Sequence, residues 1–191
     1  MSRAALLLLL CVAPLAACGA EPDDPPPVFE VQAPEGRKQA DFPRAGMKLS
    51  QPANWRLRRR RPPAVFELAS GQALVAGWAY PREEPLPESP GQLEAARDRL
   101  VDAIEERDPD YRVRSALVTE VAGAPAIVIR GEQVLSRRTL HTRSVHVFEG
   151  EVEYVIEAIA PPRDHRLVSR RVLRPLLNSL ELDGEVAEDA G

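Results

Sequence analysis

The chain has 191 residues, of which 44% are hydrophobic, and this is enough for one domain with a sizeable core. Its formal net charge is −4, yet residues 41–180 hold 22 Lys and Arg against 19 Asp and Glu, so the central part is slightly basic. An excess this small argues against a nucleic-acid-binding protein, which needs a strongly basic face.

The first residues are typical of an export signal. One cation, Arg3, precedes an apolar run over 4–17, which is too short to span a bilayer because a spanning helix needs roughly 20 residues. The run ends in "LAAC", which is similar to the bacterial lipobox and implies cleavage before Cys18 and a diacylglyceryl group on its thiol. Residues 1–17 are therefore predicted to be a lipoprotein signal peptide. The alternative is a plain secreted protein, cut near Ala20, in which the cysteine is incidental.

Composition divides the rest of the chain into three parts. Residues 18–40 are acidic and rich in proline, which predicts an extended tether of about 3.1 Å per residue. Residues 41–182 are predicted to form a single domain, and residues 183–191 an acidic disordered tail. The tether has one apolar cluster, which could instead dock on the domain as a strand: Val28, Phe29 and Val31.

The first strands are expected between residues 47 and 80. A strand over 47–50 is followed by a turn at "PAN", after which Trp55 is expected to pack back onto the core. The runs "PAVFELAS" and "QALVAGWAY" are separated by Ser70-Gly71, which predicts a β-hairpin.

The first helix has the clearest local signals. Ser89 is a suitable N-cap, Pro90 suits the first helical position, and Gln92 completes a capping box. Asp108 precedes a proline and therefore ends the helix. Its apolar stripe is Leu93, Ala96, Leu100, Ala103 and Ile104.

Four strands and a last helix follow. In the first strand, Tyr111, Val113, Leu117 and Val121 are expected on one face. In "EVEYVIEAIA" the inward face is Val152, Tyr154, Ile156 and Ala158, and the wetter face is Glu151, Glu153, Val155 and Glu157. Asp164 is expected to cap a helix that runs to Leu180, with an apolar side and an arginine side. The order of elements predicts an α+β fold, a central antiparallel β-sheet with helices packed on its faces.

Four segments, "QPANW", "GAPAIVIRG", "GEVEYVIEAIA" and "LRPLLNSLEL", occur in an order that resembles the PsbP-like superfamily. This superfamily includes the photosystem protein PsbP and LpqN-type bacterial lipoproteins. The resemblance implies an α/β/α sandwich over most of 42–182. It also implies binding to other proteins without catalysis, and it brings over no catalytic residues.

The sequence offers little for catalysis or metal binding. His141 and His146 are five apart on one predicted strand, so they point to opposite faces, and His165 lies at a helix start. We interpret all three as surface histidines. Neither Ser70 nor Ser89 lies in a nucleophile motif, and no glycine-rich phosphate loop is present. We therefore predict no catalytic residues, no metal and no cofactor.

The most unusual segment is "WRLRRRRPP", which contains the candidate anion- or partner-binding residues Arg58, Arg59, Arg60 and Arg61. A second candidate is the arginine side of the last helix, with Arg170, Arg171 and Arg174. The alternative for the first run is a solvated hairpin tip. We expect an exported protein, lipid-anchored to a bacterial membrane, that binds a protein or cell-envelope component and no nucleic acid. The alternative is a cell-envelope hydrolase with a dispersed active site.

Overall fold

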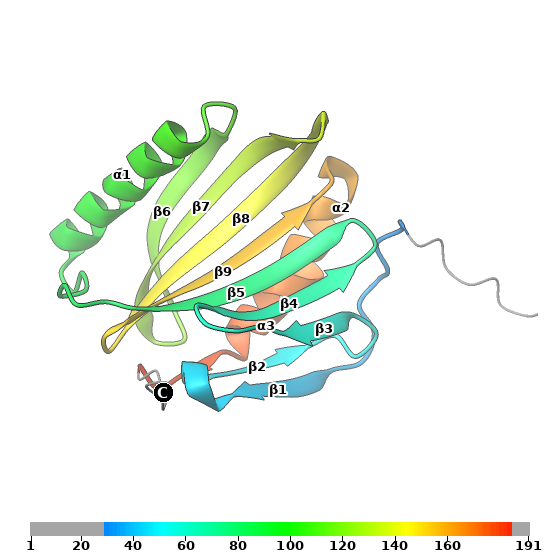
Figure 1. Ribbon diagram of the computed structural model, residues 1–191, viewed down its shortest axis with the longest axis horizontal. Coiled ribbons are helices and arrows are strands. Elements are labelled where there is room, and N and C mark those ends of the chain that lie inside the picture. The colour runs from blue at the N-terminus through cyan, green and yellow to red at the C-terminus, as the bar shows by residue number, and fades with distance from the viewer. Residues whose placement is uncertain (1–28, 185–191) are drawn as a thin grey trace, which may run out of the picture.

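The computed structural model describes residues 29–184, which form a large sheet, a small sheet, one long helix and a C-terminal helical rod (Figure 1). The large sheet is fully antiparallel, and its spatial order is β3 (Arg56–Arg59), β4 (Ala64–Ser70), β5 (Ala73–Pro81), β9 (Val152–Ala160), β8 (Arg138–Glu149), β7 (Ala124–Leu135) and β6 (Arg112–Val121). The small sheet has the order β1 (Lys38–Phe42), β2 (Met47–Gln51) and β10 (Glu181–Leu182). The predicted α+β class is confirmed.

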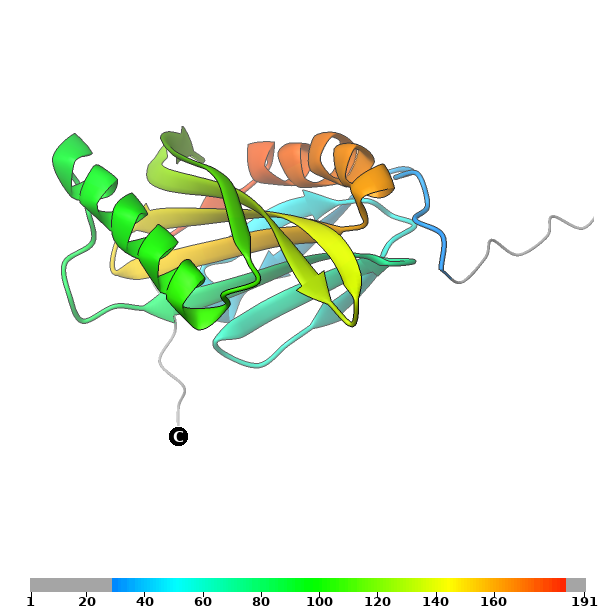
Figure 2. The same cartoon turned by 90° about the horizontal axis from the view of Figure 1, so that it is seen from above.

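The two faces of the large sheet are covered differently (Figure 2). Helix α1 (Pro90–Arg107) lies on one face, over β6 and β7. The opposite face carries the small sheet and a rod made of α2 (Pro162–Leu167), the π-helical segment η2 (Val168–Leu173) and α3 (Arg174–Asn178). None of the described helices is long and apolar enough to cross a bilayer.

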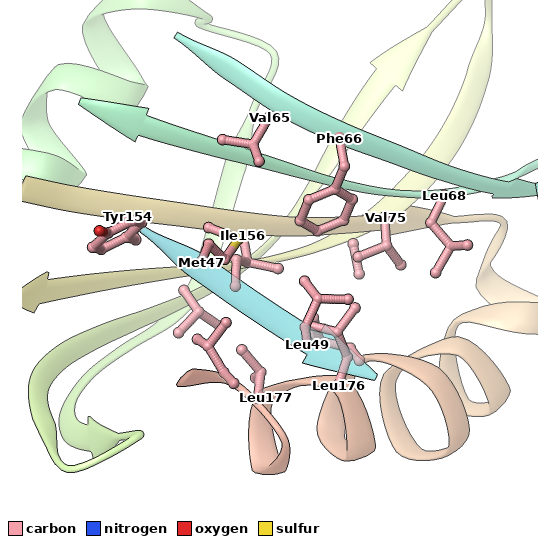
Figure 3. Close-up of a cluster of buried hydrophobic side chains, with 14 of the residues drawn as sticks. Met47, Leu49, Val65, Phe66, Leu68, Val75, Tyr154, Ile156, Leu176 and Leu177 are labelled. Atoms are coloured by element: carbon pink, nitrogen blue, oxygen red, sulfur yellow. The ribbon is translucent and has the colours of Figure 1, made fainter. Parts of the chain in front are cut away.

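The main core lies between the large sheet and the layer formed by the rod and β2. Figure 3 shows Met47 and Leu49 of β2 lying between strand residues such as Phe66 and rod residues such as Leu176. Tyr154 and Ile156 of β9 face this core and are fully buried, as their alternation predicted. This core orients the rod, so it also fixes which polar groups of the rod face the sheet.

Helix α1 is formed by the local signals described above. The Ser89 hydroxyl accepts from the Gln92 backbone N–H, and the Gln92 side chain accepts from the Ser89 backbone, so the predicted capping box is present. Leu93 and Ala96 are buried against Ile127, Ile129 and Phe148 in a second, smaller core. Ala103 is exposed, unlike the other members of the predicted stripe.

The domain begins earlier than the predicted boundary at residue 41. Val31 is buried in the main core, whereas Phe29 is 71% exposed. The backbone N–H of Gln32 donates to Ser70 Oγ at 2.9 Å, and its carbonyl accepts from Trp55 Nε1 at 3.1 Å. The segment therefore docks through Val31 and its neighbours, so the second half of the predicted tether belongs to the domain. Val28 lies outside the described residues.

Strand β6 does not keep one apolar face. Its register with β7 shifts between Val113 and Ser115, which marks a β-bulge. The extra residue reverses the alternation, so Val113 packs on the α1 side and Val121 on the rod side. Leu117 is 51% exposed. The prediction of one shared face for this strand was therefore wrong, because regular period-two alternation does not survive a bulge.

The start of the rod also differs from expectation. Helix α2 begins at Pro162, with Pro161 as N-cap and no side-chain cap, so Asp164 lies in the first turn and does not cap it. All six apolar residues that the periodicity placed on one side are buried: Val168, Val172, Leu173, Leu176, Leu177 and Leu180.

Candidate anion-binding pocket

A cavity of about 430 Å³ lies between the outer strands β6, β7 and β8 and the end of the rod. Its β6 wall is the segment 117–122. The remaining lining residues are Val128 and Arg130 of β7, Arg143 of β8, and Arg174, Leu177 and Asn178 of α3. Three arginines from three different elements therefore share one cavity.

Two of these arginines are cross-strand neighbours. Arg130 and Arg143 are directly opposite each other in the β7–β8 register. Like charges in this position destabilise a sheet, because their Cβ atoms are only about 5 Å apart. Arg174 then adds a third cation from the rod. Among the described residues no carboxylate forms an ion pair with any of the three, although Glu120 also lines the cavity.

Arg143 is the most constrained of the three. Its Nη1 donates to Ser169 Oγ at 3.1 Å, and this serine lies in the π-helical segment. Its Nε is buried and has no acceptor in the described structure. Burial, and after it the charges of Arg130 and Arg174, lower the pKa of the Arg143 guanidinium below its ordinary value. A guanidinium has five N–H donors, so most of its hydrogen-bonding capacity is available to a ligand.

Two histidines adjoin the arginines. The rings of His141 and His165 meet edge to face, with centroids 5.3 Å apart. Burial, followed by the charges of His141 and Arg143, lowers the pKa of His165, so its neutral form is favoured. Its Nε2 is buried without a partner in the part of the chain that is described. His141 lies 3.5 Å from a carboxylate oxygen of Glu132.

This arrangement is suited to binding an anion. Guanidinium groups bind carboxylates and phosphates through paired N–H donors, and such charge-assisted bonds are about twice as strong as neutral ones. The cavity has the volume of a small-molecule or side-chain site. Within residues 29–184 no group of three His, Cys, Asp or Glu could hold a metal ion.

A second polar cluster lies on the α1 side of the sheet. His146 is buried, and its Nδ1 lies 2.7 Å from Glu153 Oε1, so the imidazole donates to this carboxylate. Arg82 donates to the same carboxylate. Two predictions were therefore wrong: His146 is not on the surface, and Glu153 is not on a wet face. Both residues are stabilised in the interior because each has a partner.

The structure brings three of the four arginines of the predicted run to one cavity and leaves the fourth, Arg58, outside it. Arg58 is exposed, and Arg59 lies over the Phe42 ring at 4.8 Å and donates to the Asp41 carbonyl at 2.6 Å. Arg60 forms an ion pair with Glu67. Arg61, together with Arg59 and Arg60, lines a separate cavity of about 300 Å³ whose walls include Phe42 and Val65.

The other predicted site residues are divided by the structure. Arg174 lines the arginine pocket, whereas Arg170 and Arg171 are exposed on the rod and do not line it. The predicted lipidation site, Cys18, lies outside the described residues.

Arg130 and Arg143 were not predicted as site residues. They face each other because a two-residue turn, Ser136-Arg137, joins β7 to β8, and both turn residues have positive φ (50° and 64°). This geometry is that of a type I′ turn, which usually contains Asn or Gly. The sequence Ser136-Arg137 is therefore a weak signal for a hairpin. Had the turn been located there, the pairing would have followed, because Arg130 and Arg143 are equally distant from the centre of the turn.

The antiparallel sheet, with α1 on one face and the rod on the other, defines an α+β protein with a PsbP-like fold. It is similar to the solution structure of the cyanobacterial PsbP protein CyanoP from Synechocystis, with a TM-score of 0.57 and 10% identity over 89% of this chain and 99% of that one. It is also similar to the crystal structure of LpqN, a protein involved in cell envelope biogenesis in Mycobacterium tuberculosis. That comparison has a TM-score of 0.53 and 13% identity, and covers 77% of this chain and 90% of LpqN.

A Bacteroides thetaiotaomicron crystal structure is similar with a TM-score of 0.54 and 10% identity over 78% of this chain, which spans half of that protein. No protein-family profile and no curated protein matches the sequence. The predicted resemblance is thus confirmed at the level of the fold, since all the identities are low.

Proposed function

We propose that this protein is an exported, lipid-anchored binding protein whose PsbP-like domain takes an anionic group of a protein or envelope component into the arginine pocket. The observation that carries the proposal is the unneutralised trio Arg130, Arg143 and Arg174 around one cavity. Such a site costs stability in the absence of a ligand, because like charges repel and one guanidinium is partly desolvated. Functional sites often carry a cost of this kind.

Export and anchoring are supported by the lipobox-like "LAAC" at residues 15–18. The likeness of the fold to LpqN, itself a protein of cell envelope biogenesis, is consistent with this location. A thiol-linked diacylglyceryl group supplies two acyl chains, and two are enough for stable anchoring.

The proposed ligand group is a carboxylate or a phosphate. A carboxylate has two coplanar oxygens and a phosphate has oxygens arranged tetrahedrally, and either group accepts paired hydrogen bonds from one arginine. The pocket also has apolar walls from Val128 and Leu177, so the anion would be part of a larger molecule with an apolar portion next to its charge. A free inorganic ion would leave these walls in contact with water.

We propose binding without catalysis, but one observation favours the hydrolase alternative. The His146–Glu153 pair has the form of a base and its orienting acid, and Ser144 is two residues from this histidine on the same strand and face. Among the described contacts no hydroxyl bonds to His146. A fluorophosphonate probe tests this alternative directly, since covalent labelling of Ser144 would support a hydrolase and contradict our proposal.

The binding proposal is tested with inorganic phosphate and pyrophosphate as probes, by calorimetry on the full chain solubilised in non-ionic detergent. Arg143→Gln should weaken binding of pyrophosphate by about tenfold or more, since a hydrogen bond to a charged group contributes roughly 1.5–3 kcal/mol. The matched control is Arg58→Gln, an exposed arginine of the predicted run, which should bind as the wild type does. Binding should also decrease as salt rises.

The same variant separates loss of binding from loss of folding. Removing one of three mutually repelling cations should leave the melting temperature of Arg143→Gln equal to or above that of the wild type without ligand. Equal pyrophosphate affinities for wild type and Arg143→Gln, or a loss with Arg58→Gln alone, would contradict the pocket as the binding site.

A further inference from the structure

The two edges of the large sheet are protected very differently. The β3 edge is four residues long, and three of the four are arginines: Arg56, Arg58 and Arg59. A proline pair, Pro62-Pro63, follows after two more arginines. Short length, like charges and nearby proline all prevent a further strand from pairing with an edge.

The β6 edge has none of these protections over its second half. Strand β6 has ten residues without proline, and within the described chain its only strand partner is β7. Leu117 and Val118 are 51% and 36% exposed, and as consecutive strand residues they present apolar side chains on both faces of the edge. An exposed edge of this kind is a template for an additional strand.

Helix α1 limits the available length. Val113 and Ala116 pack against the α1 core, whereas the segment after them, Leu117–Val121, does not. The open part of the edge is therefore about five residues long, which is the length of an average strand.

This open segment is also the wall of the arginine pocket, which residues 117–122 line. Arg130 lies opposite Ser115 in the register, two residues before Leu117, and reaches the rod side of the sheet with Arg143. A strand added outside β6 would be about 4.8 Å from it, the same spacing that separates β6 from β7. The added strand would lie about 10 Å from β7 and about 14 Å from β8, so a carboxylate on its rod-side face would extend inward towards Arg130, the exposed arginine nearest the edge.

We propose that the Leu117–Val121 edge accepts an extended segment of a partner protein as an eighth strand, with a Glu or Asp of that segment bound in the arginine pocket. Main-chain hydrogen bonds would supply affinity, and the pocket would select an acidic residue at one position. The inference rests on the proposed function, because the pocket provides the charge complementarity that identifies the partner as acidic.

The probe is a fluorescent peptide, acetyl-Thr-Val-Glu-Val-Thr-Val-Ser-amide, measured by anisotropy against the full chain in non-ionic detergent. One control peptide has Lys in place of Glu. Two further controls carry N-methyl groups on alternate backbone nitrogens, one on the odd-numbered and one on the even-numbered residues, so that each blocks the hydrogen bonds of one edge of the peptide strand. We expect the Glu peptide to bind at least about tenfold more tightly than the Lys control and than one of the two N-methylated controls. Arg130→Gln, at the pocket arginine nearest the edge, should weaken binding of the Glu peptide by about tenfold, and Val118→Lys should weaken the Glu peptide through the edge alone.

The outcomes separate the two levels of the proposal. If both N-methylated peptides and the unmodified peptide bind equally while Arg130→Gln weakens them all, the edge proposal is overturned and the anion pocket stands. If Arg130→Gln binds every peptide as the wild type does, the acidic-segment proposal is overturned, and the pyrophosphate titration of Arg143→Gln decides separately whether the pocket stands. A chain that is already a dimer by light scattering, with β6 amides protected from hydrogen exchange, would assign the edge to a second copy and overturn the partner-segment proposal.

Discussion

Replacing Glu153 with Gln should destabilise the domain strongly at neutral pH and weakly in acid. The carboxylate is buried and accepts hydrogen bonds from His146 Nδ1, at 2.7 Å, and from the Arg82 guanidinium. Gln has the same shape but no charge, and its amide NH₂ would face one of these donors. The change therefore removes charge-assisted hydrogen bonds without creating a cavity.

The size of the effect follows from the two bonds. Hydrogen bonds to a charged group contribute roughly 1.5–3 kcal/mol each, and breaking a buried pair costs about 3–5 kcal/mol. Because Arg82 is about half exposed, its share is small, so we expect a loss of about 3 kcal/mol. In a domain of this size each 1 kcal/mol lowers the melting temperature by about 2–4 °C, which gives a decrease of roughly 6–12 °C.

The pH dependence gives the sharper test. Burial raises the pKa of the Glu153 carboxyl, but the hydrogen bonds from His146 and Arg82 outweigh burial and hold it below the ordinary value of 4.5. A depressed pKa in the folded state means that the stabilisation is present at neutral pH and is lost as the pH falls through 4.5 and then through the folded-state pKa. The difference between wild type and Glu153→Gln should therefore shrink in this acid range.

Urea unfolding followed by circular dichroism, at pH 7 and at steps from pH 5 to pH 3, measures both quantities. Glu151→Gln is the matched control, because this glutamate lies in the turn that joins β8 to β9 and is exposed, and its variant should match the wild type within about 0.5 kcal/mol. A loss below about 1 kcal/mol for Glu153→Gln at pH 7, or a difference that stays constant down to pH 3, would refute the role given to the buried pair.

Three further predictions concern the anchor, the core and the arginine run. Cys18→Ser should abolish metabolic labelling with a fatty acid and move the protein from the detergent phase to the aqueous phase; unchanged partitioning would contradict the lipobox. Leu176→Ala should lower the free energy of unfolding by about 2–5 kcal/mol in urea titrations, because the side chain is fully buried, whereas the exposed Asn178→Ala should change it by less than about 1 kcal/mol. Arg59 and Arg60 replaced together by Ser should lower the melting temperature by only a few degrees in calorimetry, since one exposed ion pair and one cation–π contact contribute roughly 0–1 kcal/mol each; a larger decrease would show that the run is structural.

The parts of the fold that the sequence predicted are those with signals close together in the chain. Ser89, Pro90 and Gln92 define the start of α1 within four positions, and Ser70-Gly71 defines a hairpin. The face assignment of β6 was wrong because one bulged residue changes the parity of every residue after it, and no composition rule marks that residue.

The candidate site was harder to predict because its members are brought together by register. Arg174 was identified as part of a charged helix side, but Arg130 and Arg143 look like solvated strand residues until the hairpin is aligned. Similarly, alternation places Glu153 on the outward face, and its burial is explained only by its contacts with His146 and Arg82. In each case the role of the residue depends on which residue it contacts, and a single sequence does not specify that contact.

The docking of Gln32 on Ser70 determines on which side of the domain an N-terminal anchor would be attached. The chain leaves the domain towards its N-terminus beside the β4–β5 hairpin, on the flank that carries β3. Five strand spacings of about 4.8 Å separate β4 from β6, so the sheet is a rigid spacer of roughly 24 Å between the point of attachment and the arginine-lined flank. If Cys18 carries the proposed lipid, the domain is attached through the β3 flank, and the arginine-lined flank lies on the side of the sheet away from the attachment point.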